Sequence, residues 1–175
     1  MGLLSDIFGI STTAEPQIPE MVSVLPQNAV ALIEGGILPT LNVPTLMLRA
    51  DEQCHYVDKA CLLVSKTIVT HYDGTRGGVS IRIMKGVTLR GGKSRTTPVR
   101  EKVTNIAPGY LYLTSSRIVF TAQENAFEKS IGGLTSITPY SNAIGLQFGK
   151  EVYNLLLPTP IQAFATVKMI QERTT

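Results

Sequence analysis

The sequence has few of the residues on which catalytic and metal-binding proteins depend. Its 175 residues include two cysteines, two histidines and no tryptophan, and only 17% are charged. No apolar run is long enough to cross a bilayer, and the first ten residues lack the cationic start of a secretory signal. We therefore expect a cytoplasmic protein with no transmembrane segment. Peripheral attachment to a membrane surface stays open.

The scarcity of cysteine and histidine limits metal and redox chemistry. Cys54 and Cys61, taken with His55 and His71, match no standard zinc spacing. On an unbroken strand, their odd separation would send the two cysteines to opposite faces. We interpret both as small buried hydrophobic side chains, with a metal or redox site and a catalytic thiol as the alternatives.

Catalytic motifs are also missing. No serine, histidine and acid follow one another with a nucleophile elbow. Asp51-Glu52 fits a solvated strand start as readily as a catalytic dyad. The run that ends in Gly-Lys-Ser is no phosphate loop, because five residues separate Gly86 from Gly92 where the motif needs four. We predict that the chain is not an enzyme and binds no metal and no cofactor.

Strand-forming segments dominate what the sequence does contain. Runs of β-branched and aromatic residues alternate with turns that use the ten prolines and fifteen glycines. We expect Gln53 to Val69 to be a strand interrupted near Asp58-Lys59, a turn at Asp73-Gly74, and a type II′ hairpin at Gly149-Lys150. The other predicted strands are Leu46 to Arg49, Val79 to Ile83, Val87 to Arg90, Val99 to Ile106, Tyr110 to Thr114, Arg117 to Thr121, Phe127 to Ile131, Leu134 to Tyr140, Ala143 to Phe148 and Val152 to Leu157.

A short helix is predicted between Leu25 and Gly36, with proline near its start and glycine past its end. Such a helix is too short to be stable alone, so Val30, Leu32 and Ile33 should dock on a later part of the chain. We expect residues 1–25 to be a flexible N-terminal segment. Residues 26–175 should form a single domain with this helix as an N-terminal extension.

A second helix is predicted from Thr159 onward, where Thr159, Pro160 and Gln162 resemble an N-cap, a first-turn proline and a capping box. Its spacing gives one apolar side that should cover a sheet. The residues expected on that side are Ala163, Phe164, Val167 and Ile170, and those expected away from it are Gln162, Thr166, Glu172 and Arg173.

Three motifs carry a resemblance to a known family. The segment from Gly109 to Phe120 reads G-x-L-Y-x-T-x-x-R-h-h-F, where h is apolar; Gly133 to Leu146 reads G-x-x-S-x-x-P-Y-x-x-x-I-x-L; and Tyr153 to Pro158 reads Y-x-L-x-x-P. The first closely resembles a hairpin of bacterial pleckstrin-homology-like and GRAM-like domains, and the other two are further points of likeness. The resemblance extends from about Ala50 to Glu172.

That resemblance implies a mainly β fold: a split barrel of about seven antiparallel strands capped by a C-terminal helix, here with an extra N-terminal helix and strands. A small barrel is filled by its own side chains, so function should sit on loops, edges or the outer face. We expect Arg117, just after the hairpin turn, to be an outward anchor for local hydrogen bonds. Some family members recognise phosphoinositides through a basic loop between the first two strands, but no lipid specificity is carried over.

Charge is unevenly placed along the chain. Between Arg76 and Lys102 there are eight cations and one acid, a net charge of +7, whereas the remaining eight cations and twelve acids give −4. We interpret this basic lobe as a candidate site for an anion or a partner. The alternative is a solvated face that protects an exposed sheet edge. The cations are Arg76, Arg82, Lys85, Arg90, Lys93, Arg95, Arg100 and Lys102.

Together these features predict a non-enzymatic binding or scaffold module that docks to a protein partner or to anionic lipid headgroups. Nucleic acid is a less favoured partner, because the lobe has no interleaved aromatics and contact would be limited to the phosphate backbone. A structural subunit of a larger assembly is a further alternative. Residues 3–10 carry an apolar patch that fits either another chain or this one. The sequence leaves the oligomeric state open.

Overall fold

The computed structural model describes residues 19–74 and 96–174, with the backbone alone for 66–74 and 96–103. The chain divides into two compact units. The core unit extends to Leu63 and resumes at Ile106, and the hairpin unit is Val64–Asn105. Strands β1 (Cys54–Gly74) and β2 (Thr96–Thr114) contribute residues to both units.

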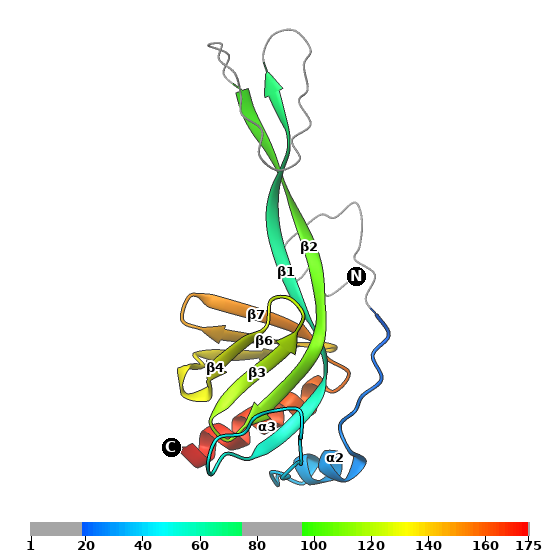
Figure 1. Ribbon diagram of the computed structural model, residues 1–175, viewed down its shortest axis with the longest axis vertical. Coiled ribbons are helices and arrows are strands. Elements are labelled where there is room, and N and C mark those ends of the chain that lie inside the picture. The colour runs from blue at the N-terminus through cyan, green and yellow to red at the C-terminus, as the bar shows by residue number, and fades with distance from the viewer. Residues whose placement is uncertain (1–18, 75–95, 175) are drawn as a thin grey trace. The chain divides into compact units, whose positions relative to one another are not determined.

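The strands form one seven-stranded antiparallel sheet in the order β4-β3-β2-β1-β7-β6-β5 (Figure 1). The sheet starts at β4 and ends at β5, so within the described residues it is open between these strands. This order and the C-terminal helix confirm the predicted mainly β fold class. The remaining elements are α2 (Gln27–Glu34), β3 (Arg117–Ala122), β4 (Phe127–Ser130), the 3₁₀-helix η1 (Ile131–Gly133), β5 (Ser136–Pro139), β6 (Ala143–Phe148), β7 (Glu151–Leu156) and α3 (Pro160–Thr174).

Several predicted strand limits were wrong. β1 continues through Asp58-Lys59 and through Asp73-Gly74, where an interruption and a turn were expected. Leu46 to Arg49 forms no strand: the Leu46 N–H donates to the carbonyl oxygen of Val43, and the Arg49 carbonyl oxygen accepts from the Glu52 N–H, both at 3.1 Å. Ile131 belongs to η1 and not to β4. The predicted strands Val79 to Ile83 and Val87 to Arg90 lie outside the described residues.

β2 is continuous where two strands were predicted, and Gly109 explains how it continues. This residue pairs with Ala122 of β3. A Cβ atom at Gly109 would lie 2.0 Å from the carbonyl oxygen of Thr121, so the neighbouring backbone approaches too closely for any other residue. The Pro108-Gly109 pair therefore marks a close approach of two strands and not the end of one.

The turn between β6 and β7 confirms its prediction. Phe148 pairs with Glu151, which leaves Gly149 and Lys150 as a two-residue loop. Gly149 has φ of 61°, and positive φ at the first central position is what a type II′ turn requires.

Helix α2 ends in a Schellman motif. Gly36 has φ of 76°, its N–H donates to Ile33 O at 3.0 Å, and the Ile37 N–H donates to Leu32 O at 2.9 Å. The expected docking side was partly wrong: Ala29 and Ile33 are buried, whereas the side chain of Leu32 is exposed.

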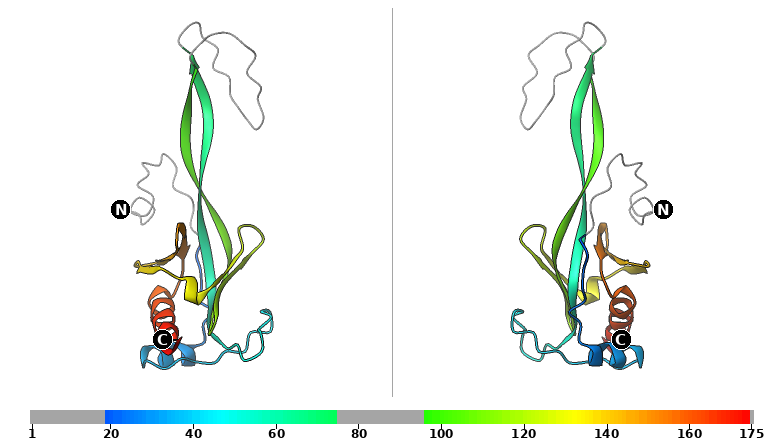
Figure 2. Two further views of the ribbon diagram at one scale, coloured as in Figure 1. Left: turned by 90° about the vertical axis from the view of Figure 1, so that its left-hand side faces the viewer. Right: turned by 90° about the vertical axis from the view of Figure 1, so that its right-hand side faces the viewer.

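Helix α3 packs against β5 and β6 and beside α2 (Figures 1 and 2). Its buried face differs from the prediction, because Thr166 is buried and Phe164 is only half-buried. The Thr166 hydroxyl donates to the carbonyl oxygen of Gln162 at 2.7 Å, which satisfies it inside the core. The predicted capping box is absent, since Gln162 donates instead to Glu34 Oε1 of α2 at 3.0 Å.

The opposite face of the sheet is covered by the chain that precedes β1. Val43 packs in a buried cluster with Cys54, Tyr112 and Val119, and Leu46 packs against this cluster. Both faces of β3 are therefore apolar and closed to water at its start. This arrangement places the next residue on that face, Arg117, in a buried environment.

Candidate functional site

The basic lobe predicted from the sequence falls on the connection between β1 and β2. Arg100 and Lys102 lie in β2. The other six, from Arg76 to Arg95, lie outside the described residues. The segment of the chain that joins β1 to β2 is therefore the most basic part of the sequence.

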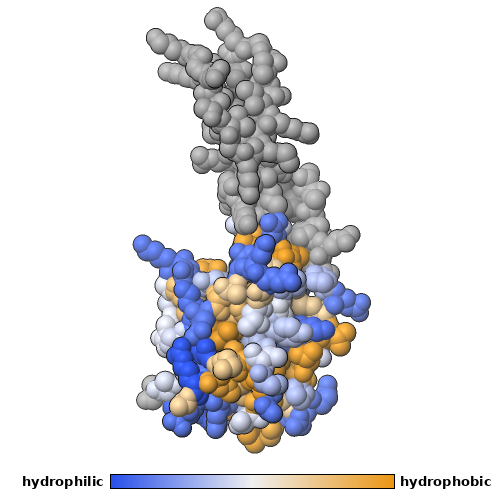
Figure 3. All heavy atoms as spheres, in the orientation of Figure 1, coloured by the Kyte–Doolittle hydropathy of each residue, from blue (hydrophilic) through white to orange (hydrophobic). Residues whose placement is uncertain are grey.

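The basic lobe lies wholly within the hairpin unit. The hairpin unit, Val64–Asn105, contains nine lysines and arginines and two acids, a net charge of +7. The rest of the chain contains seven cations and eleven acids, a net charge of −4. The face of the core unit that Figure 3 shows carries both hydrophilic and hydrophobic side chains.

A buried ion pair organises the start of β3. Arg117 Nε lies 2.8 Å from Glu52 Oε1, and both side chains are almost fully buried. The same carboxylate accepts hydrogen bonds from the hydroxyls of Thr114 and Ser116 at 2.5 and 2.9 Å and from the Arg49 N–H at 2.8 Å. Arg117 does anchor hydrogen bonds, as expected, but its side chain is buried and not outward. Glu52 is buried as well, so the prediction of a solvated strand start is wrong for this residue, whereas Asp51 is exposed.

A second carboxylate extends this cluster to β4. Glu128 lies 3.0 Å from Arg117 Nη1 through one oxygen and 2.8 Å from Arg49 Nη2 through the other. Arg117 Nη2 also donates to the carbonyl oxygen of Met47 at 2.5 Å. The cluster thus joins β3 and β4 to residues 43–53, which we call the anchored loop.

The pKa of Glu52 reflects this cluster. Burial raises it, but the hydrogen bonds from Arg117, the Arg49 N–H, Thr114 and Ser116 outweigh burial and lower it from 4.5 to about 2. Glu52 is therefore ionised at neutral pH and unsuited to accept a proton. Its role is to hold the loop and the hairpin turn together.

A third carboxylate, Asp58, fixes the segment before α2. It accepts hydrogen bonds from the Ser23 hydroxyl at 2.7 Å, the Val24 N–H at 2.8 Å and the Thr159 hydroxyl at 2.6 Å. The Tyr56 hydroxyl lies 2.8 Å from that of Thr159, and burial raises the pKa of Tyr56. Residues 19–25, which we call the strap, are thereby tied to β1 and to the start of α3.

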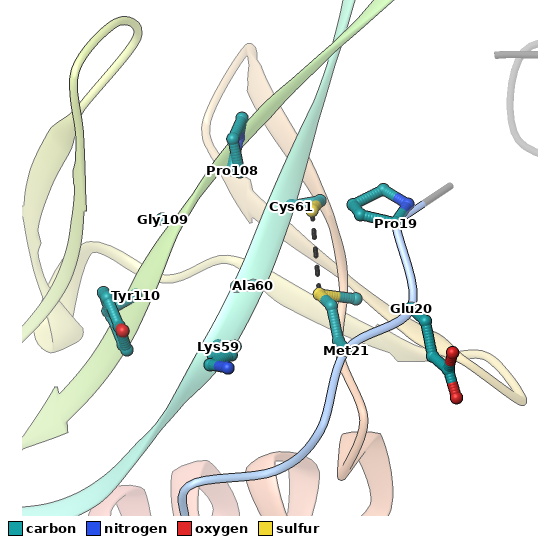
Figure 4. A pocket seen from close by; sticks show the side chains of 9 residues that line it. All are labelled: Pro19, Glu20, Met21, Lys59, Ala60, Cys61, Pro108, Gly109 and Tyr110. Atoms are coloured by element: carbon teal, nitrogen blue, oxygen red, sulfur yellow. Dashed lines mark hydrogen bonds between the residues drawn. The ribbon is translucent and has the colours of Figure 1, made fainter. Parts of the chain in front are cut away.

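A shallow pocket of about 310 Å³ lies between the strap and the first two strands (Figure 4). Cys61 on β1 donates to the sulfur of Met21 on the strap at 3.6 Å, and Tyr110 on β2 is half-exposed on the opposite side. Glu20 and Lys59 also contribute to the lining. The remaining lining residues are Pro19, Ala60, Pro108 and Gly109.

The two cysteines both lie in β1 and are buried, as expected. Cys54 belongs to the cluster with Val43, and Cys61 to a separate buried cluster. Burial raises the pKa of both thiols, that of Cys54 to about 11, which disfavours the thiolate. Among the described residues, no three histidine, cysteine, aspartate or glutamate side chains lie together as a metal site. His55 is buried, with its Nδ1 2.7 Å from the carbonyl oxygen of Pro39.

Sequence reasoning missed the two anchoring carboxylates, although one signal was present. Arg117 and Val119 share a face of β3, and Ile118 and Phe120 share the other. A strand that is apolar on both faces is covered on both, so an arginine at its start needs a buried acid. Nothing comparable in the sequence singles out Asp58.

No family model and no curated protein matches the sequence. Among solved structures, the chain is similar to the Vps36 N-terminal PH domain, with 16% sequence identity and a TM-score of 0.43, over 78% of this chain and 92% of that one. Among the described residues, no helix is both long and apolar enough to span a bilayer.

Proposed function

We propose that this protein is a non-enzymatic binding module of the pleckstrin-homology-like and GRAM-like type, which docks to an anionic surface through its β1–β2 connection. The observation that carries this proposal is the separation of charge, with +7 on the hairpin unit and −4 on the rest of the chain. A lobe of one sign raises the local concentration of anions and orients the approach to a charged partner.

An anionic membrane surface is the target that we favour. Each lysine or arginine near such a surface contributes about 1 kcal/mol, and the attraction is screened within about 10 Å in salt. The protein would be cytoplasmic and peripheral, and an acidic protein surface is the alternative partner. The proposed contacts are Arg76, Arg82, Lys85, Arg90, Lys93, Arg95, Arg100 and Lys102.

Liposome sedimentation tests the proposal. We expect vesicles that contain phosphatidylserine to bring the protein down at low salt, pure phosphatidylcholine vesicles to leave it in solution, and added salt to release it. Replacing Arg82, Arg90 and Lys93 with glutamine should cost about 3 kcal/mol, or roughly a hundredfold in binding.

A matched triple variant controls for net charge. Lys150, Lys168 and Arg173 are exposed residues of the core unit, and their replacement with glutamine removes the same charge elsewhere. This variant should bind vesicles as well as the wild type does. If neither vesicle type binds at low salt, the membrane target is wrong, and a gel shift with DNA of two unrelated sequences then tests a phosphate-backbone binder.

A further inference from the structure

The pocket of Figure 4, which we call the strap pocket, is the open edge of a core cluster. Cys61 belongs to the buried cluster with Leu63 and Leu156, and Met21 packs against that cluster. Both residues also line the pocket, where the Cys61 thiol donates to the sulfur of Met21. An apolar group placed in the pocket would therefore extend an existing apolar core.

The lining of the strap pocket favours an uncharged occupant. Its charged members are one acid, Glu20, and one base, Lys59, so their formal charges cancel. Most of the other lining residues are apolar, and Tyr110 is 41% exposed. A recess that is mostly apolar, with few polar groups, takes an apolar ligand.

The chain itself supplies an apolar segment directly before this pocket. Residues 1–18 lie outside the described part of the chain and join it at Pro19, which is itself a lining residue. Residues 3–10, which we call the apolar segment, carry one charge, Asp6, and five large apolar side chains: Leu3, Leu4, Ile7, Phe8 and Ile10. On a helical projection these five fall on one side, opposite Ser5 and Gly9.

A segment of this length needs an apolar surface in order to be ordered. Helices shorter than about 12 residues are only marginally stable in water. Helix α2, with eight residues, shows how this chain meets that need, since it docks through Ala29 and Ile33. The apolar segment has the same length and the same kind of apolar side.

The tether between the apolar segment and the strap pocket is short. Nine residue steps lead from Ile10 to Pro19, and they span at most roughly 32 Å. Asp58 holds the strap through Ser23 and Val24, so the point of attachment is fixed. A tether of this length gives an effective concentration of about 1 mM, which exceeds that of a second copy in a micromolar solution.

We propose that the apolar segment, residues 3–10, docks in the strap pocket of its own chain, with its apolar side against Met21 and Tyr110. At an effective concentration of about 1 mM, a contact with a dissociation constant of about 0.1 mM keeps the segment docked in roughly nine chains of ten. The docked segment covers Tyr110 and closes the pocket to other apolar ligands.

Tryptophan fluorescence of the full chain tests this proposal, because the sequence contains no tryptophan. Phe8→Trp places one indole on the apolar side of the segment, and Leu4→Trp places it at a second position on that side. At least one reporter should emit at shorter wavelength, and be quenched less by acrylamide, than free tryptophan in water. The spectrum should not change between about 1 and about 100 µM protein, because the contact lies within one chain.

Variants on both sides locate the contact. Ile7→Asp in the segment and Tyr110→Asp in the pocket should each weaken docking at least tenfold, which lowers the docked fraction to about half or less and moves the emission to longer wavelength. Tyr110→Thr removes the same ring with a residue that favours strands, and it serves if the aspartate variant does not fold. Ile161→Asp, at a residue of α3 that is 71% exposed, is the matched control and should leave the emission unchanged.

Each of four results overturns the proposal. Both reporters could emit like solvated tryptophan. The emission could stay at short wavelength in the folded Tyr110 variants, in which case the segment docks elsewhere. It could respond to Ile161→Asp as strongly as to Tyr110→Asp. Finally, it could move to shorter wavelength as the protein concentration rises, which would make a second copy the partner of the segment.

Discussion

Glu52 and Asp58 are two buried carboxylates that lie close in sequence, and each fixes a different part of the chain before β1. Glu52 is paired with a guanidinium, that of Arg117. Asp58 receives its hydrogen bonds from neutral groups: two hydroxyls and the N–H groups of Val24 and Lys59. A buried carboxylate is thus stabilised by a countercharge at Glu52 and by neutral hydrogen-bond donors at Asp58.

The difference determines what a substitution leaves behind. If either partner of the Glu52–Arg117 pair is removed, the other remains as an unpaired buried charge. If Asp58 is changed to an amide, its neutral donors lose part of an acceptor but no countercharge is stranded. The two anchors should therefore respond differently to neutralisation and to salt.

The largest effect is expected from Arg117→Ala. It strands the Glu52 carboxylate and frees the Met47 carbonyl oxygen, so the free energy of unfolding should fall by about 3–5 kcal/mol. Urea unfolding followed by circular dichroism measures this loss. The double variant Glu52→Leu with Arg117→Met should be more stable than either single variant, since it removes both charges together.

If the double variant lost as much as the two single variants combined, the charges would be acting independently. In that case Glu52 and Arg117 would have no coupling energy, and the contrast between a charge-paired Glu52 and a neutrally bonded Asp58 would not hold.

Acid should weaken the Glu52 anchor over a defined interval. The pKa of Glu52 is about 2 in the folded chain and 4.5 in its ordinary state. Because the folded value is lower, its stabilisation is fully present above about pH 4.5 and is lost as the pH falls toward 2. The amount at stake is about 3 kcal/mol.

Glu52→Gln should therefore flatten the decline in unfolding free energy between these pH values. Urea titrations of the wild type and the variant at several pH values measure the slopes. Equal slopes would show that Glu52 is not the group that titrates.

Asp58→Asn should have a smaller effect, about 1–3 kcal/mol, because an amide oxygen can still accept some of the hydrogen bonds. The loss should be local: hydrogen exchange at the Val24 amide should accelerate more than exchange in β6. Ser23→Ala, which deletes one donor and leaves the carboxylate, should cost about 0.5–1.5 kcal/mol. Uniform acceleration across the core unit would mean that Asp58 supports the whole fold and not the strap in particular.

Much of the fold could be predicted from local patterns. β6 has the predicted bounds, and β3 and α3 differ from theirs by a residue or so, because alternation, turn glycines and a first-turn proline are signals carried by neighbouring residues. The breaks predicted in β1 and β2 were wrong for a reason outside the local sequence. The carboxylate of Asp58 accepts hydrogen bonds from the strap and from Thr159, so Asp58 stays within β1. Gly109 stays within β2, where only a glycine fits against the backbone of β3.

The candidate sites were less predictable, because their partners are distant in the chain. Glu52 and Arg117 are 65 residues apart, and the lining of the pocket comes from three segments. The basic lobe was visible as composition, but its position on the β1–β2 connection needed the strand bounds. Local patterns therefore predict elements well and long-range anchors poorly.

The smallest effect is expected from Arg49→Ala, which tests the exposed edge of the same charged cluster. Its guanidinium pairs with Glu128 at 2.8 Å, but 66% of the side chain is exposed, so the pair should contribute only about 0.2–1 kcal/mol. Salt near 1 M should abolish that contribution, because screening then acts within about 3 Å, whereas the cost of Arg117→Ala should persist in the buried pair. Urea unfolding of both variants at low and high salt measures the contrast. A salt-sensitive Arg117→Ala would place that guanidinium among the solvated charges and remove the distinction between the rim and the interior of the cluster.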